Sequence, residues 1–563
     1  MKYADLGREY NIPPKRIQDW FQKRLHPRFI STVLRCEDAR IEWEKRFSHE
    51  AFANIVEPSK VYRTFLPLKN RESIHRISYA IKEIIQDSIE GCAVGIIVLS
   101  PYTMKYGPRW MLDLKDRIQN HQDEIEKSLN HLFKPDSSKQ YRIGIVEDRL
   151  YIRAKEEKQE PDYVHLLSDE MFYFTQDYKQ ALISETRKKL GVNGNYTLSK
   201  IIGHLAKPER VEVPKYRLLS ELSPQTDYLF GHTLEMMLDI LGLSFKEIED
   251  NINHIGVSGQ ILHPKLSSSE TYLDIFTRLY SIVISDGNIE SGAGTRIFYA
   301  EKDPNRRYTV SNLVQKLGGV GISESKSSLG EVNGLIFTSV LGRMMHKLGI
   351  PRGDKMVQEP SLPSWIINGD TGTISAYLEE LLPEEAWITF DYNKARIGIG
   401  RSKALYAPNA SETYGFTNLL SSEVLKVITR NQYRVERSFG TGSEYVYYEA
   451  TMKELRELSE SGDDETTRIV RTALKIIESH PPTLLLQERE ICQKIGIAMT
   501  QPKLRKITFS DATQRITAQW ETLTRRLQDV VRWFEIAPPN DIVKYEKLSK
   551  WVEEYRNRIG AGL

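Results

Sequence analysis

The stretch from Thr271 to Ile289 (TYLDIFTRLYSIVISDGNI) constrains the fold more than any other part of this sequence. Its apolar residues recur at helical spacing and end at an acid and a glycine, Asp286 and Gly287, where a left-handed glycine can terminate a helix. A carboxylate in the last turn opposes the helix dipole unless a cation compensates for it. The sequence therefore predicts a helix that ends at a cation site, and a divalent metal ion would supply the charge.

Length and composition limit what this helix can belong to. A chain of 563 residues is too long for one hydrophobic core and should divide into roughly three or four domains. No run approaches the ~20 apolar residues of a membrane helix, and the first residues lack the pattern of a signal peptide. Cys36, Cys92 and Cys492 are too far apart to indicate a disulfide framework or a zinc finger. We therefore expect a cytoplasmic protein with no membrane partner.

The N-terminal segment, 1–30, resembles a helix-turn-helix. Two short helical patterns are separated by a break at Pro13. If the second helix lies in a major groove of DNA, Lys15, Arg16 and Gln18 would face bases or phosphates. An ordinary helical hairpin with a solvated basic face fits the same pattern.

Residues 31–268 carry less specific signals. Within 31–165 the expected order is helix, possible strand, helix and hairpin, and the same order returns later in the chain, which suggests a degenerate copy. The early copy has Ser100-Pro101 where the later one has Asp286-Gly287, and an unrelated α/β domain fits equally well. We expect 166–268 to be a mainly helical connector.

The segment 269–480 has the most specific pattern. The helix that ends at Asp286 is followed by strand, helix, strand and helix patterns up to Gly349. A second helix, from Ala376, ends at Glu385 and leads into a hairpin pattern. An apolar helix with a terminal acid, followed by strands, therefore occurs twice.

This succession resembles the LAGLIDADG (DOD-type) homing endonuclease family. Leu279 to Gly287 is similar to the nine-residue signature of that family, and Leu348 to Lys355 (LGIPRGDK), followed by LPSWI, resembles the segment that joins its two halves. The resemblance implies an α+β fold with two pseudo-twofold-related αββαββα halves, at 269–370 and 371–480, flanked by mostly helical domains. It also implies a monomer with internal pseudo-symmetry.

The second copy of the signature departs from the family pattern. Glu385 takes the acidic place and Ala386 the glycine place. Glu380 stands where the family has a small residue that lets two helices approach, and Pro383 falls inside the last helical turn, where it removes a backbone donor. These departures favour a scaffold that binds DNA without cleaving it.

The resemblance also implies a catalytic site. In the family, acids at the ends of two adjacent helices bind divalent ions between the scissile phosphates, and Asp286 and Glu385 would be these catalytic metal ligands here. Hard oxygen ligands suit Mg²⁺, and paired metals activate a water and stabilise the leaving oxygen. Lys302 and Lys403, with Arg401 as the alternative to Lys403, match basic residues that stabilise charge on the phosphate. A solvated surface position is the alternative for each base.

Double-stranded DNA is the partner that the resemblance implies. Each half would place an antiparallel sheet in the major groove, where alternate side chains reach base edges. The candidates for DNA contact on the two sheets are Arg296, Tyr299, Glu301, Asn393, Arg396, Arg401, Arg434 and Arg437. Because the formal net charge is only +2, any DNA surface must be a local patch.

The remaining segment, 481–563, is expected to be a helical C-terminal domain, with Trp520 to Phe534 as an amphipathic helix. The chain contains no P-loop, GxGxxG, HExxH or GxSxG motif, so no nucleotide cofactor is expected. Three functions fit: a Mg²⁺-dependent, site-specific double-strand endonuclease of homing type, a non-cleaving DNA-binding transcription regulator on the same scaffold, or an RNA maturase. The intact Asp286-Gly287 and the acidic Glu385 favour the nuclease.

Overall fold

The computed structural model describes most of the chain from residue 167 onward. It covers 167–205, 215–257 and, with gaps of which 429–446 is the longest, 260–560. Before residue 167 it describes mainly 61–65, 94–98, 118–133, 139–146 and 149–156. The predicted helix-turn-helix at 1–30 therefore lies outside the described residues. Within the described residues, no helix is both long and apolar enough to span a membrane.

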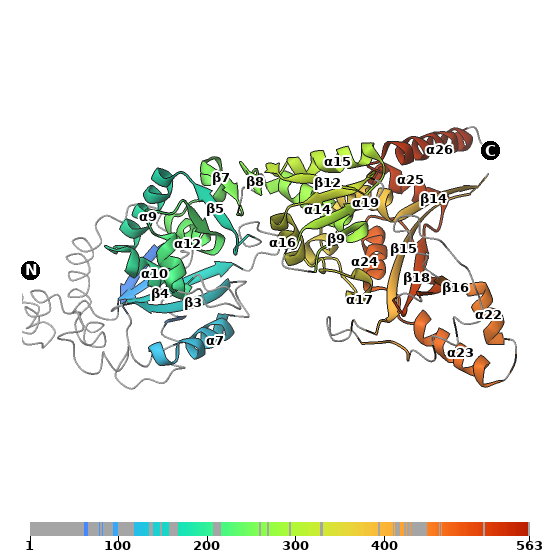
Figure 1. Cartoon of the computed structure of the whole chain (residues 1–563), viewed down its shortest axis with the longest axis horizontal. Helices are drawn as coiled ribbons and strands as arrows, with labels where there is room; N and C mark the ends of the chain where they lie inside the picture. Colours follow the sequence, from blue (N-terminus) through green and yellow to red (C-terminus); the bar gives the residue numbers. More distant parts are fainter. Residues whose placement is uncertain are drawn as a thin grey trace, which may run out of the picture. The chain divides into compact units, whose positions relative to one another are not determined.

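The chain forms two compact units, 1–158 with 162–257 and 159–161 with 258–563. It is a mixed α+β protein with several antiparallel sheets (Figure 1). The α+β class is thereby confirmed.

The first unit contains two groups of strands. One sheet has the order β1 (Val61–Phe65), β2 (Val94–Val98), β4 (Arg149–Glu156) and β3 (Lys139–Val146), with only β1 and β2 parallel. The helix α7 (Gln122–Phe133) packs on β3. In a second group, β6 (Tyr228–Phe230) and β7 (Ile252–Ile255) both pair antiparallel with β5 (Met171–Phe174). The predicted pairing of the two strands on either side of Glu147-Asp148 is confirmed, because β3 and β4 are antiparallel neighbours.

Helices make up most of the connector that we predicted at 166–268. They are α9 (Gln176–Leu190), α10 (Asn195–Leu205), α11 (Lys215–Glu221), α12 (Gly231–Leu241), α13 (Phe245–Ile248) and the short 3₁₀ helix η2 (Glu249–Asn251). The strands β5, β6 and β7 were not expected there. Each is only three or four residues long, too short for a period-two pattern to stand out from neighbouring helices.

The second unit is built around two long helices, α14 (Ser269–Ser285) and α19 (Thr371–Glu384), which pack side by side. An antiparallel sheet follows α14, with the order β12 (Ile322–Lys326), β13 (Val332–Phe337), β10 (Ile297–Ala300) and β9 (Gly287–Ile289). Another follows α19, with the order β14 (Ala386–Asp391), β15 (Lys394–Tyr406), β18 (Arg515–Leu523), β17 (Lys503–Ser510) and β16 (Tyr447–Thr451). The short strands β8 (Ile261–Leu262) and β11 (Gly319–Val320) pair with each other.

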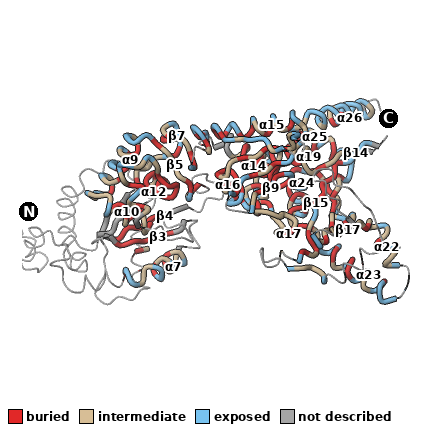
Figure 2. Tube along the Cα trace, in the orientation of Figure 1, coloured by how far each residue is buried: buried red, intermediate tan, exposed pale blue. Residues whose placement is uncertain are grey.

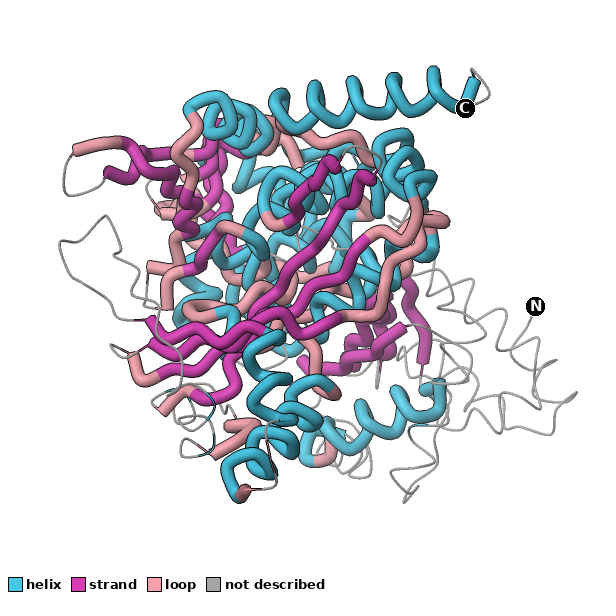
Figure 3. The backbone as a smooth tube through the Cα atoms, turned by 90° about the vertical axis from the view of Figure 1, so that its right-hand side faces the viewer, coloured by secondary structure: helices cyan, strands magenta, loops and turns pink. Residues whose placement is uncertain are grey.

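Further helices surround this framework, and α14 and α19 lie in its buried interior (Figure 2). In sequence, α15 (Pro304–Gln315) lies between β10 and β12 of the first sheet, and the helices between the two sheets are α16 (Ser339–Lys347), α17 (Lys355–Gln358) and α18 (Ser364–Ile367). The later ones are α22 (Met452–Glu460), α23 (Glu465–Glu478), α24 (Thr483–Lys494), α25 (Leu527–Ile536) and α26 (Ile542–Gly560). Figure 3 shows the strands of this unit and the long C-terminal helix α26 running along its outside.

The prediction that 481–563 is helical was wrong in part. β17 and β18 lie in this segment and belong to the sheet that follows α19. Trp520, which we expected on an amphipathic helix, is a fully buried residue of β18, and the helix begins only at Leu527. The pairing of β18 with β15, more than a hundred residues earlier, selects the strand, and a local pattern cannot reveal such a partner.

The contact between α14 and α19 includes a hydrogen bond between the two helices. The Ser281 hydroxyl donates to the carbonyl oxygen of Tyr377 at 2.8 Å, and both residues are fully buried. A small side chain at this position lets the α19 backbone come within hydrogen-bonding distance. Ser281 therefore lies at the close contact between the helices.

We expect Ser281→Leu to lower the free energy of unfolding by about 1–3 kcal/mol, because a larger side chain here would force the helices apart. Ser281→Ala is the control, since it removes only the hydrogen bond and should cost about 0.5–1.5 kcal/mol. Chemical denaturation of the two variants would measure both values. Equal stabilities for the leucine variant and the wild type would contradict the close contact.

Gly287 is needed for a different reason from the one we predicted. It begins β9 and is not in the left-handed conformation. A Cβ atom at this position would lie 2.6 Å from the Cα atom of Val283 and 2.9 Å from its carbonyl oxygen. The chain folds back so closely against the last turn of α14 that only glycine fits.

Candidate functional site

The ends of α14 and α19 carry the two acids singled out in the sequence. Asp286 directly follows α14, and Glu385 is the C-cap of α19. The Asp286 side chain is exposed, and the side chain of Glu385 is 33% exposed and lies 3.1 Å from Nη1 of Arg401. The structure therefore brings the predicted metal ligands to the ends of two neighbouring helices.

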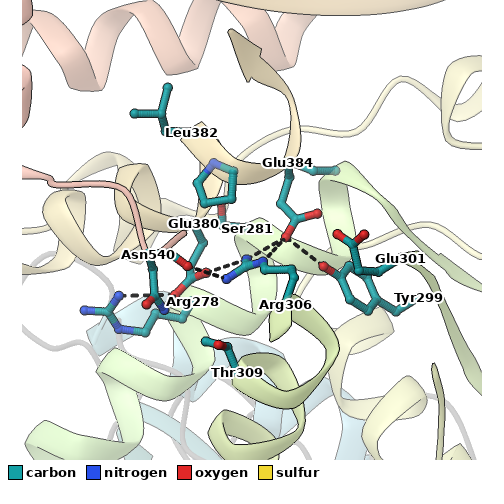
Figure 4. Close-up of polar contacts among 12 residues, drawn as sticks. Arg278, Ser281, Tyr299, Glu301, Arg306, Thr309, Glu380, Leu382, Glu384 and Asn540 are labelled. Carbon is teal, nitrogen blue, oxygen red and sulfur yellow. Dashed lines mark hydrogen bonds and ion pairs between the residues drawn. The ribbon is translucent and has the colours of Figure 1, made fainter. Parts of the chain in front are cut away.

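A third carboxylate, Glu384, also belongs to this site, and we did not predict it. Its side chain is 1% exposed. Its Oε1 atom accepts hydrogen bonds from the Tyr299 hydroxyl at 2.9 Å and from Nε and Nη2 of Arg306 at 2.9 and 2.5 Å (Figure 4). The Asp286 carboxyl group lies close enough to raise the pKa of Glu384. Glu384 thus links the interior to the exposed acid.

Glu384 and Asp286 interact, and both carboxyl groups have raised pKa values. Burial raises the pKa of Glu384 to about 8, and its interaction with Asp286 adds to this, while the Arg306 guanidinium opposes it. Loss of hydration raises the pKa of Asp286 as well, and the charge of Glu385 contributes, against the effect of Lys355. Two carboxyl groups in contact titrate as a pair. This pair therefore holds one proton at a pH where ordinary carboxyl groups have lost theirs.

We expect the folded protein to lose stability as the pH rises from about 4.5 to 8. Over this range the folded state binds a proton at Glu384 that the unfolded chain has released, so the free energy of unfolding falls with pH. Glu384→Gln should flatten that part of the curve. Thermal denaturation in EDTA at a series of pH values would measure it. Parallel curves for wild type and variant would show that Glu384 is ionised throughout.

Lysines cap both helices at the site. Lys355 Nζ donates to the carbonyl oxygens of Val283, Ile284 and Ser285, the second at 2.8 Å. Burial lowers the pKa of Lys355 to about 8 and Arg401 lowers it further, whereas Glu385, Asp286 and Glu384 raise it. The cation that we expected at the end of α14 is therefore supplied by the protein itself.

The end of α19 has an equivalent cap. Lys544 Nζ, from α26, donates to the carbonyl oxygens of Leu382 at 2.8 Å, Pro383 at 2.7 Å and Ala386 at 3.2 Å. Burial lowers the pKa of Lys544. The C-terminal end of each helix is thus capped by a lysine from elsewhere in the chain. This lysine donates to the last carbonyl groups of the helix and complements its dipole.

Both unusual residues of α19 are compensated by neighbouring groups. Glu380 is fully buried and lies 2.7 Å from Nη2 of Arg306 and 3.3 Å from Nη1 of Arg278. Pro383 cannot donate to the carbonyl of Glu379, which instead accepts from the backbone N–H of Asn540 at 3.0 Å. The side chain of Asn540 also donates to Glu380 at 2.7 Å. Asn540, in the segment before α26, therefore stabilises α19, which Glu380 and Pro383 would otherwise weaken.

The predicted phosphate-binding base Arg401 lies in the interior. It is 6% exposed, its Nη2 atom is 2.5 Å from Oε1 of Glu488, and its Nη1 atom contacts Glu385. The hydroxyl of Tyr377 also donates to Glu488 at 2.7 Å. A DNA contact by Arg401 is therefore not supported, because its guanidinium is engaged by two carboxylates away from the surface.

The other two predicted phosphate-binding residues, Lys302 and Lys403, differ in exposure and in ion pairing. Lys302 is exposed after β10, whereas Lys403 lies 2.6 Å from Glu359 and its side chain is 12% exposed. An ion pair therefore engages the ammonium group of Lys403. Lys302 remains open to a ligand at the surface.

The predicted DNA contacts on the first sheet do not all share a face. Arg296 is exposed and pairs with Glu290 at 2.9 Å. Tyr299 is fully buried and points to Glu384, so it is not a DNA contact, and Glu301 lies on the same alternation as Tyr299. On the second sheet Arg396 is exposed. Asn393, Arg434 and Arg437, like Lys15, Arg16 and Gln18, lie outside the described residues.

The carboxylates at the helix ends suit a hard divalent cation. Within the described residues no group of three or more His, Cys, Asp and Glu side chains is placed to hold a metal ion. Asp286 and Glu385 would thus provide two oxygen ligands, and Mg²⁺ is commonly held by one or two carboxylates together with waters and substrate phosphates. A cation would also offset the charge of Glu385, which adds to the loss of hydration that raises the pKa of Asp286.

The residues that the sequence reasoning missed had little local signal. Glu384 stands next to Glu385, but only tertiary packing decides which of the two side chains is buried. Lys355 lies in the LGIPRGDK segment, and Gly353 in that segment donates to the carbonyl of Ile289 at 2.7 Å, which places the lysine beside the end of α14.

No known protein-family model and no curated protein sequence matches this chain.

Proposed function

We propose that this chain is a DNA-binding protein with the two-half scaffold of the LAGLIDADG family, and that it is a Mg²⁺-dependent, site-specific double-strand endonuclease. The observation that carries the proposal is the arrangement of α14 and α19, which lie side by side and end at Asp286 and Glu385. Each helix runs directly into the first strand of an antiparallel sheet. The lysine caps at both helix ends also support the proposed two-half scaffold.

The chain's own residues would do the following in that reaction. Asp286 and Glu385 would hold Mg²⁺, which supplies an activated water and stabilises the leaving oxygen. Glu384 would stay protonated beside Asp286 until the cation binds. Lys302, exposed after the first sheet's central strand, would offset charge on the phosphate. The sheets would contact the DNA through their outward-facing side chains.

A second function, a DNA-binding regulator that does not cleave, is favoured by the second half of the site. Glu385 is engaged by Arg401, and Lys403 by Glu359. In a nuclease these groups would have to exchange protein partners for metal and phosphate. A regulator would keep both pairs as structural contacts.

One experiment tests the proposal and separates the two functions. The full chain is incubated with a library of duplex oligonucleotides, first in Ca²⁺ to select bound sequences, then in Mg²⁺ to detect double-strand cleavage of the selected site. Binding followed by Mg²⁺-dependent cleavage supports the nuclease. Binding without cleavage supports the regulator, and no duplex binding at low salt rejects both and leaves RNA or protein partners.

A further inference from the structure

A small pocket opens on the sheet that follows α19, at the end of β18. It has a volume of about 240 Å³, below the ~300–1,000 Å³ of pockets that take drug-sized ligands. Its walls come from three adjacent strands and from the segments beside them. The lining residues are Arg396, Thr500, Lys503, Glu521, Leu523, Thr524 and Arg525.

The strand register explains why these side chains converge. Lys503 of β17 is paired with Glu521 of β18, and Leu523 of β18 is paired with Gly398 of β15. Paired residues point to the same face of a sheet, and so do residues two apart on one strand. Arg396, two residues before Gly398, therefore shares a face with Lys503, Glu521 and Leu523.

The pocket has an excess of positive charge. Arg396, Lys503 and Arg525 are exposed at its rim, and within the described part of the chain no ion pair engages their head groups. The one acid of the lining, Glu521, is 8% exposed and lies 3.1 Å from Nε of Arg505. Burial raises its pKa against the effect of Arg505 and Lys503. Three cations thus face the pocket, and its single carboxylate has a cationic partner of its own.

Two hydroxyl groups add directed donors. Thr500 Oγ1 accepts the backbone N–H of Leu523 at 3.0 Å, and Thr524 Oγ1 accepts that of Ile397 at 3.1 Å. A hydroxyl has one proton to donate besides its acceptor capacity. Among the described residues neither hydroxyl donates to a protein acceptor, so each proton is available to a ligand. Fixed hydroxyl donors and cations together match the oxygens of a tetrahedral anion.

We propose that this pocket binds a phosphate group through Arg396, Lys503, Arg525 and the hydroxyls of Thr500 and Thr524. As a contact to a DNA backbone the site rests on the proposed function and extends it, since it would fix the position of the second sheet on the duplex. The same chemistry would also take the phosphate of a small free ligand. The test separates these two sources.

The test uses the full chain and the double variant Lys503→Gln/Arg525→Gln, with Lys453→Gln as the control, because Lys453 is 86% exposed on α22 and does not line the pocket. Inorganic phosphate is titrated by calorimetry at constant ionic strength. We expect the double variant to bind phosphate at least ~10-fold more weakly than the wild type, because it lacks two charged hydrogen-bond donors. The control should bind as the wild type does. Thermal denaturation checks that the variants fold.

A second arm uses the duplex selected in Ca²⁺ and measures affinity against salt concentration. If the pocket holds a backbone phosphate, the slope of log affinity against log salt should decrease by about 0.9 for each phosphate that the double variant no longer neutralises, and inorganic phosphate should compete with the duplex. Weaker phosphate binding with unchanged DNA binding, or with no DNA binding in the wild type, assigns the pocket to a free ligand. Unchanged phosphate binding in a folded double variant overturns the proposal, whatever the DNA result.

Discussion

Asp286→Asn is expected to abolish Mg²⁺-dependent cleavage while leaving DNA binding intact. The substitution keeps the size of the side chain but removes the charge that a divalent cation needs. Because the metal stabilises charge in the transition state, we expect the cleavage rate to fall by about 10²–10³-fold or more. Cleavage of the selected duplex in Mg²⁺ measures this decrease, and binding in Ca²⁺ or EDTA measures the affinity that remains.

Asp274→Asn is the matched control for that experiment. Asp274 lies on the same helix, is 44% exposed and pairs with Arg278 at 3.0 Å, so its replacement should leave cleavage nearly unchanged. If the protein is a regulator, the wild type cleaves nothing. Asp286→Asn should then leave DNA affinity equal or higher, since a negative charge facing phosphate is gone. Undiminished cleavage by Asp286→Asn would show that the helix end is not the catalytic site.

Arg306→Met is expected to cause the largest decrease in stability, about 3–5 kcal/mol. Arg306 is buried and is the shared partner of Glu380 and Glu384, and its Nη1 atom donates to the carbonyl of Asn540 at 2.9 Å. Methionine fills much of the space but leaves two buried acids with fewer partners. Chemical denaturation at pH 7 measures the change in the free energy of unfolding.

Arg296→Met provides a comparison with an exposed pair. The Arg296 and Glu290 side chains are 54% and 36% exposed, and such surface pairs contribute little to stability. In a second comparison, adding Glu384→Gln to Arg306→Met should recover part of the stability, because one of the two buried acids that lost a partner is removed. Equal decreases for Arg296→Met and Arg306→Met would mean that the interior network contributes no more than a surface ion pair.

The sequence by itself determined the local framework of the second unit. The apolar spacing of Thr271 to Ile289 predicted α14, and the acid at its end marked where the helix stops. The pattern from Ala376 to Glu385 likewise predicted α19 despite Pro383. These features follow from short-range periodicity, which is fully contained in neighbouring residues.

The tertiary structure alone decided which groups meet at the helix ends. Glu384 is bound in the interior by Tyr299 and Arg306, and Arg401 is turned into the interior by Glu488, a residue on a helix far along the chain. Lys544 reaches the end of α19 from α26. Two strands of the second sheet, β17 and β18, also come from the segment that we predicted to be helical. Each of these contacts joins residues that are distant in sequence, and their identity depends on packing that no local pattern records.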